Sequence, residues 1–249
     1  MSQGIVCAPQ PEAVEAGVLA LEQGGNAVDA AIACALVQTA IDPQMCGIAG
    51  FGSMQLYLPD QGQHHFIDFH GRAPAATQED MWEDIVISET EDGFGFVLEG
   101  GVNDLGYQSI TSPGSIKAFA EAIERYGNLT LAELLEPAIE YCEQGFAVRT
   151  HVASYWNLVE AAGRIPHIER LRAIPATAKI YTREDGSIYK AGEILRNPDM
   201  GNTYRRIASA GVEDFYEGEI ASKIAADMKE NGGLLSGDDL RDFQTEQRE

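Results

Sequence analysis

The chain has 249 residues, of which 45% are apolar, and its 39 acidic and 17 basic side chains give a formal net charge of −22 at pH 7. This excess of negative charge argues against nucleic acid and anionic membranes as partners, because both require clustered Lys and Arg. The four cysteines are scattered without a CxxC motif, so we expect reduced thiols rather than a disulfide framework. Residues 1–4 do not begin a signal peptide, and we therefore expect a cytoplasmic protein.

The N-terminal part of the chain predicts one strand and two helices. Gly4–Ala8 is a short apolar run, which is typical of a buried strand. Pro11 begins a predicted helix that ends at the glycine pair 24–25. Asn26 caps a second helix, which is apolar on every side as far as Val37 and is therefore expected to be buried all round.

A glycine-rich bend and a β-hairpin are predicted next. Gly47, Gly50 and Gly52 match neither GxGxxG nor GxxxxGK[ST], and a strand rather than a helix follows them. The glycines therefore indicate a tight backbone bend and not a phosphate-binding loop. Residues 54–58 and 65–69 flank a turn signal, which predicts a hairpin.

The rest of the chain is predicted to be a solvated loop followed by helices. The acidic tract 78–95 is expected to be a solvated loop or lid. Thr130 and Glu133 form a capping-box pattern, and Pro137 lies inside the helix that they start. Periodicity and cap signals predict helices near 116–123, 130–145, 151–162, 200–210 and 219–231, a short turn after Ser236, and a small hairpin over 181–189.

His64, His65, Asp68 and His70 form the one cluster of metal-ligand residue types that the sequence singles out. On a strand, His65 points away from the other three. At roughly 3.3 Å per residue, His64 and His70 lie about 20 Å apart, so one strand cannot bring them to a single ion. We therefore expect no metal site here.

No catalytic nucleophile is evident in the sequence. The GxSxG motif is absent. The glycine-flanked residues Ser53 and Ser115 are explained by a strand start and a helix start, so a nucleophile is expected outside this chain.

Asp68 to Ala75 is the segment that most strongly suggests ligand binding. Arg72 follows a strand end and is preceded by a glycine, a position from which its guanidinium can form a two-pronged pair with a carboxylate. The alternative is a surface ion pair between Arg72 and Asp68, which contributes about 0–1 kcal/mol.

Several segments together resemble the gamma-glutamyltransferase family of N-terminal-nucleophile hydrolases. The match is most specific at GGNAVDAAIA. Further similar segments are Ala8-Pro9, Gly47-Ile48-Ala49-Gly50, Asp68 to Ala75, Ser112-Pro113-Gly114-Ser115, Gly127 to Ala138, Gly145-Phe146 and Gly232 to Leu240.

The resemblance implies an α+β fold, an αββα sandwich whose second half is rich in helices. In this family a precursor cuts itself into a large and a small chain, and the small chain begins with the nucleophilic threonine, whose own amine is the general base. Residues 1–249 are then the large (alpha) subunit of one domain shared with a partner chain, with a helix-rich portion over about 112–249. The resemblance implies no cofactor and no catalytic residue in this chain.

The resemblance also points to His70 and Arg72 as substrate-binding residues. The family arginine that binds the alpha-carboxylate of a glutamyl group aligns with His70, whereas the arginine of this sequence lies two residues later, at Arg72. The implied substrate is a small-molecule acyl amide with a carboxylate, of gamma-glutamyl or related type, as in glutathione metabolism. The alternative function is a non-catalytic ligand-binding or regulatory protein that retains half of the fold.

Overall fold

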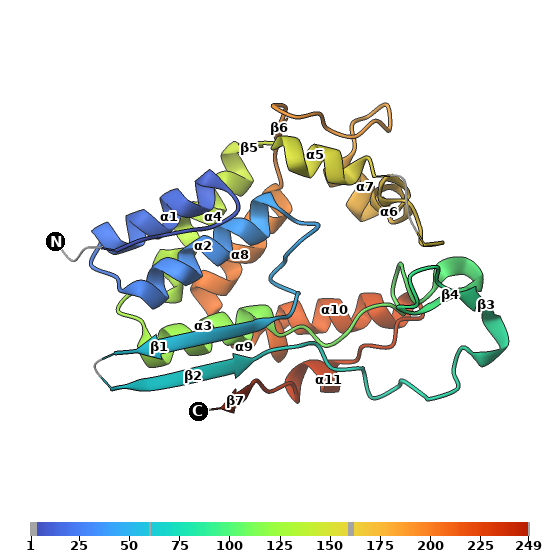
Figure 1. Cartoon of the computed structure of the whole chain (residues 1–249), viewed down its shortest axis with the longest axis horizontal. Coiled ribbons are helices and arrows are strands. Elements are labelled where there is room, and N and C mark those ends of the chain that lie inside the picture. Colours follow the sequence, from blue (N-terminus) through green and yellow to red (C-terminus); the bar gives the residue numbers. More distant parts are fainter. Residues whose placement is uncertain (1–3, 60, 159–161, 249) are drawn as a thin grey trace.

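The structure is a computed structural model that describes residues 4–59, 61–158 and 162–248. It opens with a helical hairpin, in which α1 (Pro11–Glu22) and α2 (Ala27–Ile41) lie on either side of the predicted glycine turn (Figure 1). The Asn26 side chain caps α2, and the Asp29 carboxylate accepts the backbone N–H of Asn26 in return. The predicted start of the second helix is therefore confirmed, and it is a capping box.

Burial of α2 is less complete than its sequence predicted. Most of its side chains are buried, but Ala27 and Ala31 are exposed and Ala35 and Gln38 are partly exposed. These four residues recur at helical spacing and form one stripe along the helix. The prediction of a helix buried all round was wrong because no described element covers this stripe.

The predicted strand at Gly4–Ala8 is also wrong. The segment is irregular, and no described strand pairs with it. Ile5 is 98% exposed, whereas Val6 and Ala8 pack against the core. An apolar run without a neighbouring strand gains side-chain burial on one side but no ladder of hydrogen bonds.

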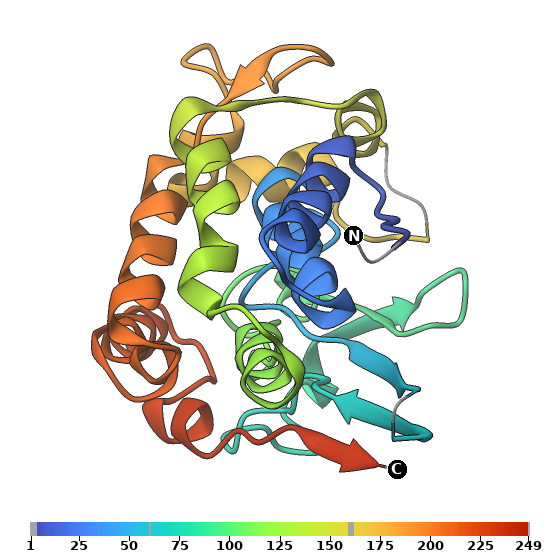
Figure 2. The same ribbon diagram turned by 90° about the vertical axis from the view of Figure 1, so that its left-hand side faces the viewer.

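A three-stranded antiparallel sheet follows the glycine bend. The hairpin of β1 (Ser53–Leu58) and β2 (Gln63–Asp68) confirms the prediction, and β7 (Glu246–Arg248) adds to β2 in the order β1-β2-β7. The register places Asp68 opposite Ser53 on one side and opposite Glu246 on the other. The C-terminal strand thus lies beside the hairpin, as Figures 1 and 2 show.

This sheet is covered on one face only. Leu56 and Ile67 are buried in the core, and Phe69, just after β2, packs its ring against Phe119 of α3 (Ser115–Tyr126). Alternate residues such as Tyr57, which is 59% exposed, point to the opposite face. Within the described chain that opposite face is open.

The second half is rich in helices, as predicted. The predicted cap at Thr130 and the short turn after Ser236 are both confirmed as capping boxes. The helices here are α4 (Leu131–Gln144), α5 (Thr150–Trp156), α6 (His167–Ala173), α7 (Pro175–Tyr181), α8 (Pro198–Ala210), α9 (Glu213–Tyr216), α10 (Glu219–Glu230) and α11 (Gly237–Arg241).

Three details of this half differ from prediction. The helix expected over 151–162 ends at Trp156, and residues 159–161 lie outside the described part of the chain. The hairpin expected over 181–189 is reduced to a single bridge between Thr182 and Ile188, because α7 extends through Tyr181. A two-residue pairing of β5 (Phe146–Ala147) with β6 (Ile194–Leu195) was not predicted.

The acidic tract is more ordered than a loop. It contains the short helix η1 (Glu83–Ile85) and the strand β3 (Val86–Glu89), which pairs with β4 (Phe96–Leu98). The short helix η2 (Glu99–Gly101) follows. Apolar residues on both sides of the turn favour strands, whereas the high charge of the tract led to the prediction of a loop.

The fold is thus a mixed α/β arrangement in which helices pack on one face of a small sheet. The described residues do not show a complete αββα sandwich, because β1-β2-β7 has only three strands and the other two sheets among these residues are two-stranded pairs, β3-β4 and β5-β6. No helix in these residues is long and apolar enough to cross a membrane.

Candidate functional site

Asp68 and His70 form a hydrogen-bonded pair where β2 ends at the open face of the sheet. The Asp68 Oδ1 atom accepts the backbone N–H of His70 at 3.0 Å and lies 2.7 Å from the ring Nδ1. The backbone N–H of His70, followed by its ring, lowers the pKa of the Asp68 carboxyl below its ordinary value. Asp68 is therefore an ionised carboxylate that can only accept hydrogen bonds.

This pair determines which nitrogen of His70 is free. Since the carboxylate only accepts, Nδ1 carries the proton, and in the neutral ring Nε2 has the lone pair. The His70 side chain is 60% exposed, and its ring lies 5.7 Å from that of Phe51, centroid to centroid. His70 thus presents a hydrogen-bond acceptor next to the glycine bend.

Arg72 lies two residues further on and has a different set of neighbours. Its guanidinium is 3.1 Å from the Glu246 Oε1 atom and lies over the Phe243 ring at 5.9 Å. The backbone C=O of Arg72 accepts the N–H of Ser112 in an isolated bridge. The alternative considered from the sequence, an ion pair between Arg72 and Asp68, is therefore not the one that forms. Arg72 pairs with Glu246 instead, because β7 brings the Glu246 carboxylate next to Asp68.

The glycine bend between α2 and β1 lines a hollow of about 730 Å³. The backbone C=O of Gly50 accepts the N–H groups of Gly114 and Ser115, and a Cβ at Gly50 would lie 2.9 Å from the backbone oxygen of Gly47. Side chains at this point would push the bend away from the start of α3, which confirms the prediction of a tight backbone bend. Phe51, Phe69 and Phe119 supply aromatic surface to the hollow.

The three histidines near β2 have separate surroundings. His64 stacks on Tyr57 with ring centroids 4.6 Å apart, and the His65 ring lies 5.5 Å from that of Tyr126. His70 is bonded to Asp68 instead. Among the described residues, no group of three or more His, Cys, Asp or Glu side chains is arranged to hold a metal ion.

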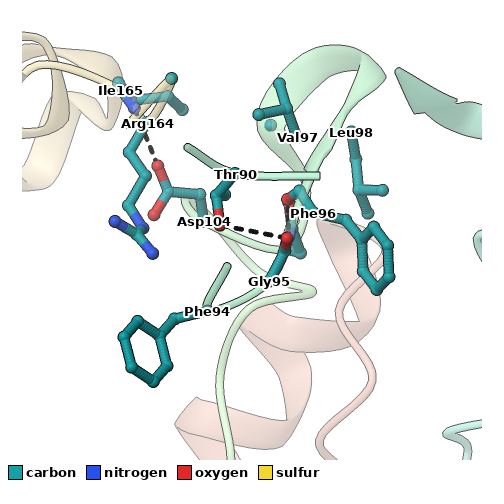
Figure 3. A pocket seen from close by; sticks show the side chains of 12 residues that line it. Thr90, Phe94, Gly95, Phe96, Val97, Leu98, Asp104, Arg164 and Ile165 are labelled. Atoms are coloured by element: carbon teal, nitrogen blue, oxygen red, sulfur yellow. Dashed lines mark hydrogen bonds between the residues drawn. The ribbon is translucent and has the colours of Figure 1, made fainter. Parts of the chain in front are cut away.

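A second cavity, of about 260 Å³, lies between the β3–β4 hairpin and the segment after Ala162 (Figure 3). Its polar groups are already engaged. Asp104 accepts the N–H of Ile165 at 2.9 Å and pairs with Arg170 at 2.7 Å, and Arg164 pairs with Asp92 at 2.7 Å. These contacts fasten the hairpin to the helical half, so this cavity is a weaker candidate for a substrate site than the hollow beside His70.

The thiols do not provide a nucleophile in this part of the molecule. Burial raises the pKa of both Cys46 and Cys142 to about 12, so both remain protonated at neutral pH. Ser53 begins β1 and Ser115 begins α3, as predicted.

Sequence reasoning missed two members of the site. Phe51 and Glu246 flank His70 and Arg72 in space, but they are separated from them by 19 and 174 positions in the sequence. The strand propensity of residues 246–248 is weak, and no local signal shows that they pair with β2.

Comparisons with known proteins agree on one family. The family model described as Gamma-glutamyltranspeptidase matches residues 13–249. The glutathione hydrolase proenzyme of Pseudomonas sp. (strain A14) is 32% identical over 243 residues, which cover 97% of this chain and 39% of that protein. The acylase ACY 1 proenzyme of Pseudomonas sp. (strain V22) is also 32% identical, over 100% of this chain and 42% of that protein.

Solved structures show the same relationship in three dimensions. The gamma-glutamyltranspeptidase of Helicobacter pylori superposes with a TM-score of 0.86 at 26% identity, and covers 100% of this chain and 66% of its own. The gamma-glutamyltranspeptidase from Pseudomonas nitroreducens complexed with L-DON gives 0.83 at 32% identity, over 100% of this chain and 67% of its own. The chain spans about two fifths of the length of the curated relatives it matches. It belongs to the gamma-glutamyltranspeptidase family.

Proposed function

We propose that this chain is the large-subunit side of an amide hydrolase or acyltransferase that cleaves a gamma-glutamyl-type or related acyl amide through an acyl-threonine intermediate. The observation that carries the proposal is the family match over residues 13–249 together with a sheet face that the described chain leaves open beside Asp68 and His70. Two relatives are described as proenzymes, of a glutathione hydrolase and of an acylase, which supports processing into two chains.

A partner chain completes the site in this proposal. It supplies the second sheet of an αββα sandwich and packs against the open face, where Tyr57 is 59% exposed. Its N-terminal threonine is both nucleophile and, through its free amine, general base. Attack of the hydroxyl oxygen on the amide carbon releases the amine, and water or an acceptor amine then takes the acyl group from the threonine ester.

Arg72 is proposed to bind the substrate carboxylate, and His70, two residues earlier, to contribute to substrate binding with its ring 5.7 Å from that of Phe51, which lines the hollow. In the Arg72–Glu246 pair both side chains are about half exposed, 51% for Arg72 and 55% for Glu246. Such pairs contribute about 0–1 kcal/mol, so a substrate carboxylate can replace Glu246 as the partner of the guanidinium. A planar, permanently charged guanidinium then forms a two-pronged pair with the substrate.

The test is reconstitution of activity. The chain is expressed with the coding sequence that follows it, and release of p-nitroaniline from gamma-glutamyl and glutaryl p-nitroanilides is measured. We expect turnover only when a threonine-initiated chain is present, and loss of turnover when that threonine is replaced by alanine. Full turnover by residues 1–249 alone, or ligand binding without any turnover in the complete assembly, would contradict the proposal and favour a binding protein.

A further inference from the structure

A groove of about 650 Å³ lies between the segment 77–83 and the β3–β4 hairpin. Val86, Phe96 and Leu98 line it from the hairpin, which is at the opposite end of the molecule from the N-terminus (Figure 1). This hairpin groove shares no lining residue with the hollow beside the glycine bend. The proposed amide chemistry therefore leaves it without a role.

The walls of the hairpin groove are apolar and held in place. Val86 is 45% exposed and Phe96 is 56% exposed, although both are large apolar side chains. The ring N–H of Trp82 donates to the side-chain oxygen of Gln108 at 3.2 Å. On the other wall, the Asn103 amide donates to the backbone C=O of Phe96 at 2.8 Å. An exposed apolar surface with a polar rim is typical of an interaction site, and fixed walls lower the ordering cost of binding.

The rim of the groove is negatively charged. The carboxylates of Glu79, Asp80 and Glu83 line it together with the apolar side chains. Residues 73–116 contain nine acidic side chains and no Lys, Arg or His. Two arginines of the helical half neutralise other carboxylates of this segment, and those carboxylates do not line the groove. The complementary ligand therefore has an apolar centre and positive charges around it.

Charge also decides against two other occupants. A second copy of this chain, with its net charge of −22, would bring the same acidic residues to the contact. A bare metal ion is not favoured either, because in the described part of the chain no three His, Cys, Asp or Glu side chains are arranged to hold one. A basic segment of a different protein satisfies both the charge and the apolar surface.

We propose that the hairpin groove is a docking site for a basic peptide segment of another protein. An aliphatic or aromatic anchor of that segment packs against Phe96 and Trp82. Lysine or arginine side chains on either side of the anchor face Glu79, Asp80 and Glu83. The contact is a binding interaction without a covalent step, and it does not depend on the proposed amide chemistry.

The experiment measures binding of a defined peptide to the complete assembly. The probe is a fluorescein-labelled nonapeptide with a central leucine, two glycines and six lysines, Lys-Lys-Gly-Lys-Leu-Lys-Gly-Lys-Lys, followed by fluorescence anisotropy. Replacing the leucine by serine should raise Kd by about ten-fold or more, because the anchor then buries little apolar surface. A peptide with glutamate in place of every lysine should not bind, and added salt should weaken the parent peptide.

Two aromatic residues of the same hairpin provide a matched pair of variants. Phe96→Ala removes part of the apolar wall and should raise Kd for the parent peptide by about ten-fold. Phe96→Leu keeps an apolar side chain and should retain most of the affinity. Phe94→Ala is the control: Phe94 is 86% exposed but does not line the groove, and its ring points in a different direction from that of Phe96 (Figure 3).

The carboxylates are tested at constant net charge. A triple variant with Glu79→Gln, Asp80→Asn and Glu83→Gln should raise Kd by about ten-fold, since exposed ion pairs each contribute about 0.2–1 kcal/mol.

The control triple variant, with Glu124→Gln, Glu136→Gln and Glu184→Gln, changes three exposed carboxylates that do not line the groove and should keep the wild-type Kd.

Three results would overturn the inference. The first is that the complete assembly does not bind the parent peptide. The second is that the two triple variants weaken binding equally, which would assign the affinity to net charge alone. The third is that Phe94→Ala costs as much as Phe96→Ala, or that the serine peptide binds as tightly as the leucine peptide, since the groove would then hold no anchor.

Discussion

The carboxylate of Asp29 accepts the backbone N–H of Asn128 at 2.9 Å, although 99 positions separate the two residues. The same side chain, which is completely buried, also accepts the N–H groups of Asn26 and Leu129. It therefore joins the turn between α1 and α2 to the turn between α3 and α4. The aspartate of the GGNAVDAAIA segment is a structural residue that ties two helical connections together.

Replacing Asp29 by asparagine should lower the free energy of unfolding by about 2–4 kcal/mol. One carboxylate oxygen then becomes an NH2 group, whose hydrogens face backbone N–H groups that need an acceptor. Urea unfolding of the complete assembly, followed by circular dichroism, measures the effect. Asp199→Asn is the control: its carboxylate is 65% exposed and meets Lys179 at 3.4 Å, so we expect a change below about 0.5 kcal/mol. Equal stability of the two variants would show that the Asp29 contacts are not needed.

The ion pair between Asp214 and Arg206 should make the free energy of unfolding depend on pH. Arg206 donates to both of its oxygens, at 2.6 and 2.7 Å, and these hydrogen bonds hold the pKa of the Asp214 carboxyl well below its usual range. A carboxyl whose pKa is lower in the folded state contributes stability above its unfolded value near 4, and this contribution declines as the pH falls toward the folded value.

In the Asp214→Asn variant, the free energy of unfolding should therefore depend less steeply on pH below about 4 than in the wild type. Unfolding by urea at pH 7, 5, 4 and 3 gives the slope. The Asp199→Asn variant, which removes an exposed carboxylate that Lys179 contacts loosely, should match the wild type in its free energy of unfolding at pH 7 to within about 0.5 kcal/mol. Parallel curves for wild type and Asp214→Asn would contradict this prediction.

Local signals in the sequence predicted the elements that depend on neighbouring residues. The caps at Asn26, Thr130 and Ser236 were predicted from residue types near each helix start, and Thr130 was also predicted to form a capping box with Glu133. The β1–β2 hairpin was also predicted locally, from two short runs on either side of a turn signal. These features need no knowledge of the rest of the fold.

Features that depend on distant partners could not be predicted. The place of β7 in the sheet, and with it the pairing of Arg72 with Glu246, joins residues 174 positions apart. The strand expected at Gly4–Ala8 failed for the opposite reason, since a strand needs a neighbour and no described segment provides one. His70 was placed near the site by family resemblance, but only the Asp68 contact reveals which nitrogen is free.

Removal of metal ions should leave the activity of the complete assembly unchanged. His64, His65 and His70 have different neighbours, so they do not converge on one ion, and the proposed nucleophile uses its own amine as base. Turnover is measured after dialysis against EDTA or phenanthroline, with a mock-dialysed sample as control. Loss of activity that returns on addition of zinc would show that the histidines have a metal-binding role.

The role of Arg72 is tested by the dependence of activity on the substrate carboxylate. Arg72→Ala should lower kcat/KM on a carboxylate-bearing amide by about ten- to a hundred-fold and have little effect on its neutral methyl ester, because charge-assisted hydrogen bonds contribute about 1.5–3 kcal/mol. Arg72→Lys should recover only part of the loss, since an ammonium cannot form the planar two-pronged pair. Arg248→Ala is the matched control and should leave kcat/KM on both substrates near the wild-type values. Arg248 also contacts Glu246, at 3.4 Å, but its side chain is 67% exposed. An equal penalty on both substrates in Arg72→Ala, or a larger loss of carboxylate dependence in His70→Ala, would assign Arg72 to the structure and the carboxylate to His70.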